Sequence, residues 1–238
     1  MLTKIKNELI YLSTLRRILS SLKAINNDEN SIITKRIASF ADKSPDSIAI
    51  YFEDREISYR ELIDGANQYS HWFLDNGLQK GDVVALLMEN RPEFLMAWIG
   101  IAQVGGTAAL INTNLTGHPL NHSLSISGAN KIILGKELVS NFETTDDTIK
   151  SSFQVWIEGD TDKTNYEKLN LALEKLSNIM PSINYNVTNE DVALYIYTSG
   201  TTGDPKAATI THRRLRLMLM GFASAVVPKK TDRIYNVL

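Results

Sequence analysis

The sequence contains no cysteine in its 238 residues. A disulfide framework, a thiolate nucleophile and a cysteine-ligated zinc site are therefore excluded. The absence of cysteine fits a reducing compartment, although it does not require one.

An excess of charge of one sign is also lacking. The 25 basic and 27 acidic residues give a net charge of -2 at pH 7. Because a nucleic-acid-binding domain usually needs a concentrated basic surface, this balance indicates that nucleic acid is not a partner. No run of about 18 apolar residues is present, so no segment has the composition of a membrane-spanning helix. With 43% hydrophobic and 22% charged residues, the composition is typical of a globular domain.

Residues 1–30 stand out as a basic amphipathic N-terminal segment. One helix face gathers the apolar residues of this segment, which are Leu2, Ile5, Leu9, Leu12, Leu15, Leu19 and Leu22. Five basic residues accompany them, and Glu8 is the only acid among residues 1–25. Such a helix either contacts a membrane interface peripherally or packs on its own domain. A mitochondrial transit peptide is a third alternative, whereas Arg16 and Arg17 interrupt the apolar run that a signal peptide would need.

From residue 31 to residue 238 the pattern indicates one domain in which strands alternate with helices. The continuous apolar run at residues 83–88 predicts a strand buried on both faces, and further strands are predicted at residues 107–111, 131–134, 153–157 and 192–197. Helices are predicted to begin at Pro92 and after Gly117, and they provide the crossovers that parallel neighbours need. The expected fold class is α/β, with layered, mainly parallel sheets and flanking helices.

Weaker signals fill the gaps between these elements. They predict a β-hairpin over residues 48–59, a helix opened by a capping box at Ser58 and Glu61, a helix near residues 166–176, and a strand just begun at residues 233–238. Outside that one helix, the polar stretch from about residue 140 to residue 189 is expected to be a surface excursion.

The segment that carries chemistry runs from Tyr195 to Lys206. An apolar strand leads into small and hydroxylic residues and then into a lysine. Gly200 and Gly203 let the backbone approach a ligand closely, and successive backbone N–H groups form a concavity suited to anions. The hydroxyl donors that can follow the phosphates of a nucleotide are Thr198, Ser199, Thr201 and Thr202. Lys206 brings a mobile positive charge to the same oxygens.

This segment differs from the common P-loop, in which glycine and lysine lead straight into a helix. Pro205 stands between Gly203 and Lys206, and residues 207–210 have the pattern of another strand. A short Ser/Thr/Gly-rich stretch alone is usually a turn, but the full pattern of residues 195–206 is far more specific.

Residues 197–206 read Tyr-Thr-Ser-Gly-Thr-Thr-Gly-Asp-Pro-Lys. They resemble the phosphate-binding signature of the adenylate-forming superfamily, the AMP-dependent synthetases and ligases. Residues 80–94, 109–115 and 206–214 are similar to the branch of fatty-acid transport proteins and very-long-chain acyl-CoA synthetases. The resemblance covers residues 32–238, so it includes nearly the whole chain.

The resemblance implies a long- or very-long-chain acyl-CoA synthetase. A fatty acid carboxylate attacks the α-phosphate of ATP and gives acyl-adenylate and pyrophosphate, after which the thiol of CoA displaces AMP. The β- and γ-phosphates are assigned to Thr198, Ser199, Gly200, Thr201, Thr202 and Gly203, with Lys206 as the catalytic and phosphate-binding cation. The reaction implies ATP, Mg²⁺ and CoA, and no metal ligand is assigned. The expected location is the cytoplasm or the cytoplasmic face of a membrane.

The resemblance reaches only roughly the first two-fifths of the family's members. The later segments that complete their active site are not in this sequence, so an incomplete N-terminal domain is expected, which alone does not make acyl-CoA. Two alternatives stay open: a ligase for another carboxylate, and a catalytically inert nucleotide- or lipid-binding remnant. A basic region at residues 213–233 could attract ATP, CoA or anionic lipid, or be a solvated helix face.

Overall fold

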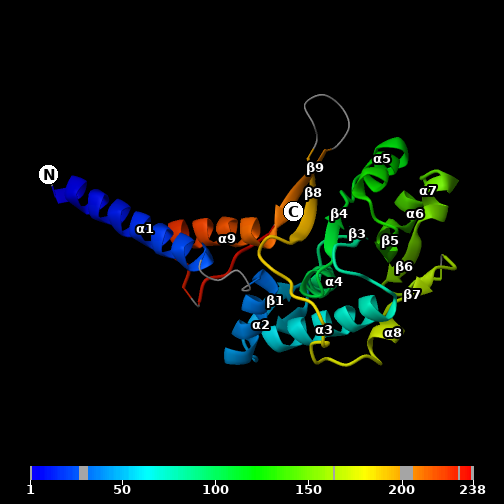
Figure 1. Ribbon diagram of the computed structural model, residues 1–238, viewed down its shortest axis with the longest axis horizontal. Coiled ribbons are helices and arrows are strands. Elements are labelled where there is room, and N and C mark those ends of the chain that lie inside the picture. Colours follow the sequence, from blue (N-terminus) through cyan, green and yellow to red (C-terminus); the bar gives the residue numbers. More distant parts are fainter. Residues whose placement is uncertain (1, 27–31, 163, 199–205, 230, 237–238) are drawn as a thin grey trace.

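The computed structural model describes residues 2–26, 32–162, 164–198, 206–229 and 231–236. Within them, seven strands form one sheet in the order β7-β6-β5-β3-β4-β8-β9 (Figure 1). The strands are β3 (Val83–Leu87), β4 (Thr107–Leu110), β5 (Lys131–Gly135), β6 (Gln154–Glu158), β7 (Glu167–Lys168), β8 (Val192–Thr198) and β9 (Lys206–Thr211). All neighbours pair parallel except β8 and β9, which pair antiparallel. The predicted mainly parallel sheet is confirmed.

The remaining elements flank this sheet or precede it in the chain. A separate two-stranded sheet consists of β1 (Ile48–Phe52) and β2 (Arg55–Ser58), which confirms the predicted hairpin. The helices are α1 (Leu2–Asn26), α2 (Ile33–Lys43), α3 (Tyr59–Asp75), α4 (Pro92–Gln103), α5 (Gly117–Ser127), α6 (Val139–Phe142), α7 (Asp147–Ser152), α8 (Asn170–Leu173) and α9 (His212–Val226), with a 3-10 turn η1 at Lys136–Leu138.

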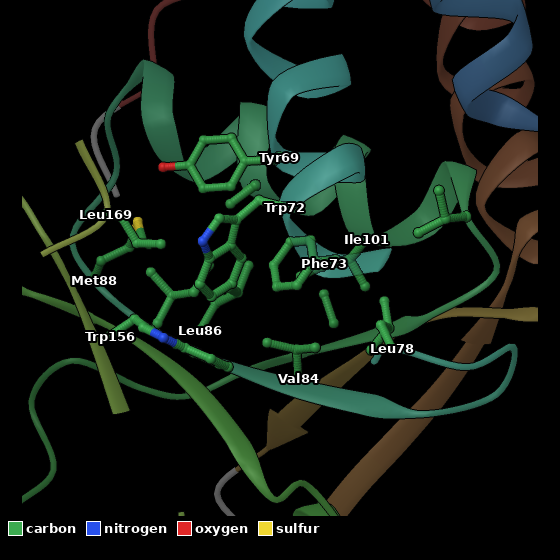
Figure 2. Packing of buried hydrophobic residues seen from close by; sticks show 14 of the residues in the cluster. Tyr69, Trp72, Phe73, Leu78, Val84, Leu86, Met88, Ile101, Trp156 and Leu169 are labelled. Atoms are coloured by element: carbon green, nitrogen blue, oxygen red, sulfur yellow. The ribbon is translucent and has the colours of Figure 1, made fainter. Parts of the chain in front are cut away.

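Strand β3 is buried on both faces because its side chains alternate between two helical layers. Val84 and Leu86 belong to the cluster formed with α3 and α4, where Trp72 and Phe73 of α3 point down onto the sheet (Figure 2). Ala85 and Leu87, the alternate residues, pack with residues of α5 and α6. A strand covered on both faces reads as a continuous apolar run, which is why the sequence predicts it correctly.

The predicted starts of two helices are also confirmed. Ser58 Oγ accepts a hydrogen bond from the Glu61 backbone N–H at 3.2 Å, and the Glu61 carboxylate accepts one from the Ser58 backbone N–H at 2.7 Å. This capping box satisfies two donors at the start of α3 that have no partner inside the helix. Pro92 occupies the first position of α4, where no backbone N–H is needed.

The helix predicted near residues 166–176 is wrong. Glu167 and Lys168 instead form the edge strand β7, and only the single turn α8 follows. Pairing with β6 stabilises the extended form, and the Trp156 indole N–H donates to the Glu167 carboxylate at 3.2 Å. The stretch 140–189 is therefore no simple surface excursion, because β6 within it lies between β5 and β7.

The strand predicted to begin at residue 233 is absent from residues 233–236, which have no regular secondary structure, and residues 237 and 238 lie outside the described part. Arg233 instead contacts Tyr51 of the β1–β2 hairpin. Its guanidinium lies 4.4 Å from the centre of the Tyr51 ring and donates to the Tyr51 hydroxyl at 3.0 Å. Residues 233–236 are therefore held by this cation–π contact and not by backbone hydrogen bonds to a neighbouring strand.

The N-terminal helix α1 lies against α9, which is almost 200 residues away in the sequence (Figure 1). Among the α1 side chains that the structure describes, Thr14, Arg17 and Ile18 are half-buried, whereas Leu12 and Leu19 of the apolar face are exposed. Among the described residues, none of the helices combines the length and apolar character that crossing a bilayer demands.

Helices α3 and α4 approach each other closely at Gly100. A Cβ atom added there would lie 2.7 Å from Tyr69 Cβ and 2.8 Å from the Ala66 carbonyl oxygen. We expect Gly100→Ala to lower the free energy of unfolding by about 1–3 kcal/mol, because overpacking forces the two helices apart. Urea denaturation of the purified chain measures this loss.

Gly221→Ala is the matched control. Gly221 also lies inside a helix, but no atom lies within 4 Å of an added Cβ atom. Alanine has the higher helix propensity, so this variant should gain up to about 1 kcal/mol. If both variants shift the urea midpoint in the same direction, close packing at Gly100 is not what the glycine provides.

Candidate nucleotide site

The candidate site lies at one edge of the sheet, where the parallel strands β3, β4, β5 and β8 end. Thr198 is the last residue of β8 and is the Cα partner of Lys206, the first residue of β9. The two residues therefore meet at the base of a hairpin. Ligands of open α/β sheets commonly bind outside the carboxyl ends of the strands.

The hairpin connection itself falls on residues that the structure leaves undescribed. Ser199, Gly200, Thr201, Thr202 and Gly203 lie outside the described residues, and so does the side chain of Thr198. Their assignment to phosphates stays a prediction.

The strand after Lys206, in contrast, is confirmed. Residues 206–211 form β9 and pair antiparallel with β8. Lys206 is exposed at the edge of the sheet, where its ammonium group is accessible to a ligand. Lys206 therefore opens a strand, which distinguishes this segment from a P-loop whose lysine opens a helix.

Strand β8 anchors the hairpin in the two hydrophobic layers. Leu194 packs in the cluster with α3 and α4, while Tyr195 and Tyr197 pack against the cluster that includes α5. Burial raises the pKa of Tyr197 to about 12, so its phenol stays protonated at neutral pH. Tyr197 thus anchors the end of strand β8 and does not act as an acid or base.

The hairpin is also tied to α9 behind it. Thr211 caps this helix by accepting from the Arg214 backbone N–H at 3.2 Å. His212 follows it and is fully buried, and its backbone N–H donates to the Asp191 carbonyl at 3.0 Å. Burial lowers the pKa of His212 to about 4, so the ring is neutral at pH 7. For His212 this burial favours a structural role over ligand contact.

A second polar cluster at the same edge escaped the sequence analysis. Arg91, between β3 and α4, donates to the Glu137 carboxylate at 2.8 Å and to the Glu158 carbonyl at 3.4 Å. Glu137 also accepts from the Glu89 backbone N–H at 3.0 Å. The Glu158 carboxylate accepts a short hydrogen bond from the Tyr69 hydroxyl. Each acid follows or ends a buried strand, which is the signal that could have found it.

The two acids of this cluster, the buried Glu158 and the exposed Glu137, differ in pKa. Burial raises the pKa of Glu158 above its usual value, although the Tyr69 hydrogen bond and Arg91 oppose the shift. Burial acts in the same direction on Glu137, but backbone N–H donors and Arg91 outweigh it and leave the pKa below the usual value. Glu137 is therefore an ionised clamp on the β3–α4 connection. In the strand order only β4 separates β3, which leads into Arg91, from β8. The cluster therefore stabilises the part of this edge next to the β8–β9 hairpin.

Among the described residues, no three histidine or acidic side chains come together as a metal site. The described residues therefore supply no ligand set to which Mg²⁺ can be assigned. A metal that accompanies a nucleotide would be held in part by the phosphates themselves.

The sheet and its flanking helices match the N-terminal domains of adenylate-forming enzymes. The sequence profile of the AMP-binding enzyme family matches residues 37–238, and the chain belongs to this family.

Its curated relatives are fatty acid transport proteins and ligases. The chain is 30% identical to long-chain fatty acid transport protein 1 of Rattus norvegicus over 98% of this chain and 37% of the relative. It is 29% identical to the medium/long-chain-fatty-acid–CoA ligase FadD6 of Mycobacterium tuberculosis over 94% of this chain and 36% of that protein. The chain thus spans little more than a third of the length of either relative.

Solved structures with a similar fold include a ligase and an isolated N-terminal domain. The anthranilate CoA ligase AuaEII, in complex with anthranoyl-AMP, has a TM-score of 0.70 at 22% identity, over 77% of this chain and 35% of that chain. The N-terminal domain of FACL13 from Mycobacterium tuberculosis has a TM-score of 0.64 at 28% identity, over 76% of this chain and 44% of that domain. The first likeness shows the fold alone, and the second links the chain to N-terminal domains of this family.

The buried His212 generates a pH prediction. Its folded pKa of about 4 lies below its ordinary value of 6.5, so the folded state binds fewer protons than the unfolded state between these two values. The folded protein should therefore lose stability as pH falls from about 6.5 to 4, by up to about 3 kcal/mol from this group. Urea denaturation at half-unit pH steps measures the slope.

The control is His212→Gln, which keeps a polar side chain but cannot titrate. Subtracting its pH profile from that of the natural chain removes the contributions of the carboxylates, including Glu158, because they are common to both proteins. A difference profile that stays flat between pH 4 and pH 6.5 would contradict a buried, neutral His212.

Proposed function

We propose that this chain provides the ATP-binding hairpin of an enzyme that activates long or very long fatty acids to acyl-CoA through an acyl-adenylate. The observation that carries the proposal is the β8–β9 hairpin. Its strands end at Thr198 and begin at Lys206, so they bracket a glycine- and hydroxyl-rich connection at the carboxyl edge of the parallel sheet. The membership of the chain in the AMP-binding enzyme family supports it.

In this proposal the connection binds the β- and γ-phosphates of ATP. Backbone N–H groups of the glycine-rich loop and the hydroxyls of Thr198, Ser199, Thr201 and Thr202 donate to the phosphate oxygens. The exposed Lys206 supplies a positive charge at the mouth of the hairpin, where charge develops on the departing pyrophosphate. Mg²⁺ bound with the nucleotide would neutralise further phosphate charge.

The chemistry then proceeds in two balanced steps. A carboxylate oxygen of the fatty acid attacks the α-phosphorus of ATP and pyrophosphate leaves, which gives the acyl-adenylate. The sulfur of CoA next attacks the acyl carbon, the thiol proton is lost, and AMP leaves. In the first step this chain binds and orients the phosphates, which lowers the entropy cost of bringing carboxylate and phosphorus together.

The names of the relatives support fatty acids as the substrate class. They include long-chain fatty acid transport proteins and a medium/long-chain-fatty-acid–CoA ligase. A ligase for another carboxylate is the second candidate, and a panel of fatty, aryl and amino acids tested on a full-length enzyme containing this segment decides between them. A location in the cytoplasm or on the cytoplasmic face of a membrane is part of the proposal. Peripheral membrane contact through residues 1–25 is also part of the proposal.

Lys206→Ala tests the role of the hairpin in the chain itself. We expect the variant to bind ATP·Mg²⁺ about tenfold more weakly in isothermal titration calorimetry, because a charge-assisted hydrogen bond to phosphate is lost. Lys175→Ala is the matched control, since Lys175 is an exposed lysine in the segment after α8 and not in the hairpin. Equal ATP affinity for the two variants would show that Lys206 does not contribute to nucleotide binding.

Turnover is a separate measurement. We expect the 238-residue chain to bind ATP but to form no AMP when palmitate and CoA are added, whereas a longer enzyme containing it should show ATP–pyrophosphate exchange that Lys206→Ala slows. Fatty-acid-dependent AMP from the purified chain would overturn the first expectation. Tight ATP binding without exchange in the longer enzyme as well would favour the inert-remnant alternative.

A further inference from the structure

Helix α9 buries polar residues and exposes apolar ones. Its buried residues are His212, Arg216 and Ser224, and the Arg216 guanidinium donates to the Asn189 side chain at 3.2 Å. Its large exposed residues follow the three- and four-residue spacing of one helix face, and they are Met218, Leu219, Phe222 and Val226. These four residues are called the α9 row below. A helix that only covered its own domain would bury this row, so the row lacks a cover among the described residues.

The sheet is also incompletely covered where α9 begins. Ile196 of β8 is 41% exposed, although β8 lies between β4 and β9. Because side chains alternate along a strand, Ile196 lies on the same face as Leu194, which belongs to the cluster formed with α3 and α4. Leu215, in the first turn of α9, packs against this cluster as well. Helix α9 therefore leaves the sheet on the face where Ile196 is only partly covered.

Strand β9 is an open edge of the sheet. It ends the strand order, and among the described residues it pairs only with β8. An edge strand presents backbone N–H and C=O groups to which a further strand can bind. Helix α9 continues from β9 and extends away from the sheet towards α1 (Figure 1). The α9 row, Ile196 and the β9 edge thus gather at the end of the sheet opposite β7.

The domain to which α9 belongs is larger than this chain. The AMP-binding enzyme profile matches residues 37–238 and so includes α9. The chain covers 44% of the N-terminal domain of FACL13, so more than half of that domain has no counterpart here. This unmatched part is called the completing segment below. Apolar side chains of one domain bury one another, so a row that one part of a domain leaves exposed fits the rest of the same domain.

We propose that the α9 row, Ile196 and the β9 edge form the surface on which the completing segment docks. In this arrangement the segment places apolar side chains over the row and over Ile196, and a strand of its own beside β9. A lipid surface would leave the β9 edge without a strand partner, whereas a polypeptide satisfies both features. The inference rests on the family membership of the chain and goes beyond the proposed ATP binding, on which it does not depend.

The absence of cysteine allows a direct test, because Met218→Cys introduces a single thiol into the α9 row. The full chain with this substitution is produced alone, co-expressed with the completing segment of FACL13, and joined to that segment as a fusion. We expect N-ethylmaleimide to alkylate the thiol at least about tenfold more slowly when the segment is present, because a buried thiol is inaccessible to the reagent. Mass spectrometry of timed samples measures the rate.

The matched control is Leu171→Cys. Leu171 is 65% exposed and lies in α8, outside the α9 row, so its thiol should react at the same rate with and without the segment. Leu219→Glu/Phe222→Glu should weaken co-purification of the separate segment at least about tenfold, because it places charge in an apolar interface. Leu171→Glu/Ile179→Glu adds the same two charges elsewhere and should leave co-purification unchanged. Circular dichroism checks that each variant is folded, which exposed positions allow.

A fusion with the corresponding part of FadD6 repeats the experiment with a second relative. If neither fusion slows the alkylation of Met218→Cys, or if Leu171→Cys is slowed equally, the proposal is wrong. Two other results would replace the completing segment by another occupant. Slow alkylation in the chain alone, with a dimer in light scattering that Leu219→Glu/Phe222→Glu dissociates, would identify a second copy. Protection by phospholipid vesicles, without protection in either fusion, would identify lipid.

ATP titration of the same fusion is a separate measurement. A protected α9 row without ATP binding would contradict the ligase proposal and leave this inference intact. ATP binding with an unprotected row would do the reverse.

Discussion

Strand β3 lies in the middle of the sheet and packs apolar side chains into two helical layers at once. Val84 and Leu86 contact the layer of α3 and α4, and Ala85 and Leu87 contact the layer of α5 and α6. Parallel neighbouring strands are joined by crossover connections. Because both faces of β3 are buried, helices from these connections must cover both faces of the sheet. The perpendicular contact of Trp72 with Trp156, with ring centres 4.3 Å apart, joins the α3 layer to β6 in the same way.

This packing places the candidate nucleotide site and the Arg91 cluster on one edge of the sheet. Because β3, β4, β5, β6 and β8 run parallel, their carboxyl ends lie together, and polar side chains gather there. The Arg91–Glu137 pair braces one part of the edge, and the β8–β9 hairpin forms another. In the first part Glu137 is paired with Arg91 and keeps the β3–α4 connection in place, whereas the second part keeps an exposed lysine. One edge thus divides into a rigid, internally paired section and an accessible one.

Much of the fold could be predicted because a strand buried on both faces has a nearly continuous apolar sequence. Residues 83–87 and 131–135 are nearly continuous apolar runs, and Ser58 and Glu61 reveal their helix by spacing alone. The failures share a cause. Glu167 and Lys168 become a strand only because β6 offers a partner, and residues 233–236 remain irregular while Arg233 contacts Tyr51. Local sequence does not contain such long-range pairings.

The candidate site divides in the same manner. The strands β8 and β9 were predictable because apolar residues precede and follow the glycine-rich segment, whereas the assignment of that segment to phosphates stays a prediction. The Arg91, Glu137 and Glu158 cluster was not, because its members are separated by 46 and 67 residues from Arg91 and meet only when the sheet forms. The apolar face of α1 was partly predictable, because periodicity reveals such a face, but only the fold shows that Leu12 and Leu19 on it are exposed.

The antiparallel pairing of β9 has a consequence for the order of folding. The ladder of β8 with β9 joins near neighbours in the chain, such as Thr198 and Lys206, whereas the ladder of β4 with β8 joins Ala108 to Leu194. Closing the short loop costs little chain entropy, and closing the long one costs more and delays pairing. The β8–β9 pair, which flanks the candidate nucleotide-binding segment, can therefore form first, and it acquires its place on the sheet only when β8 docks on β4.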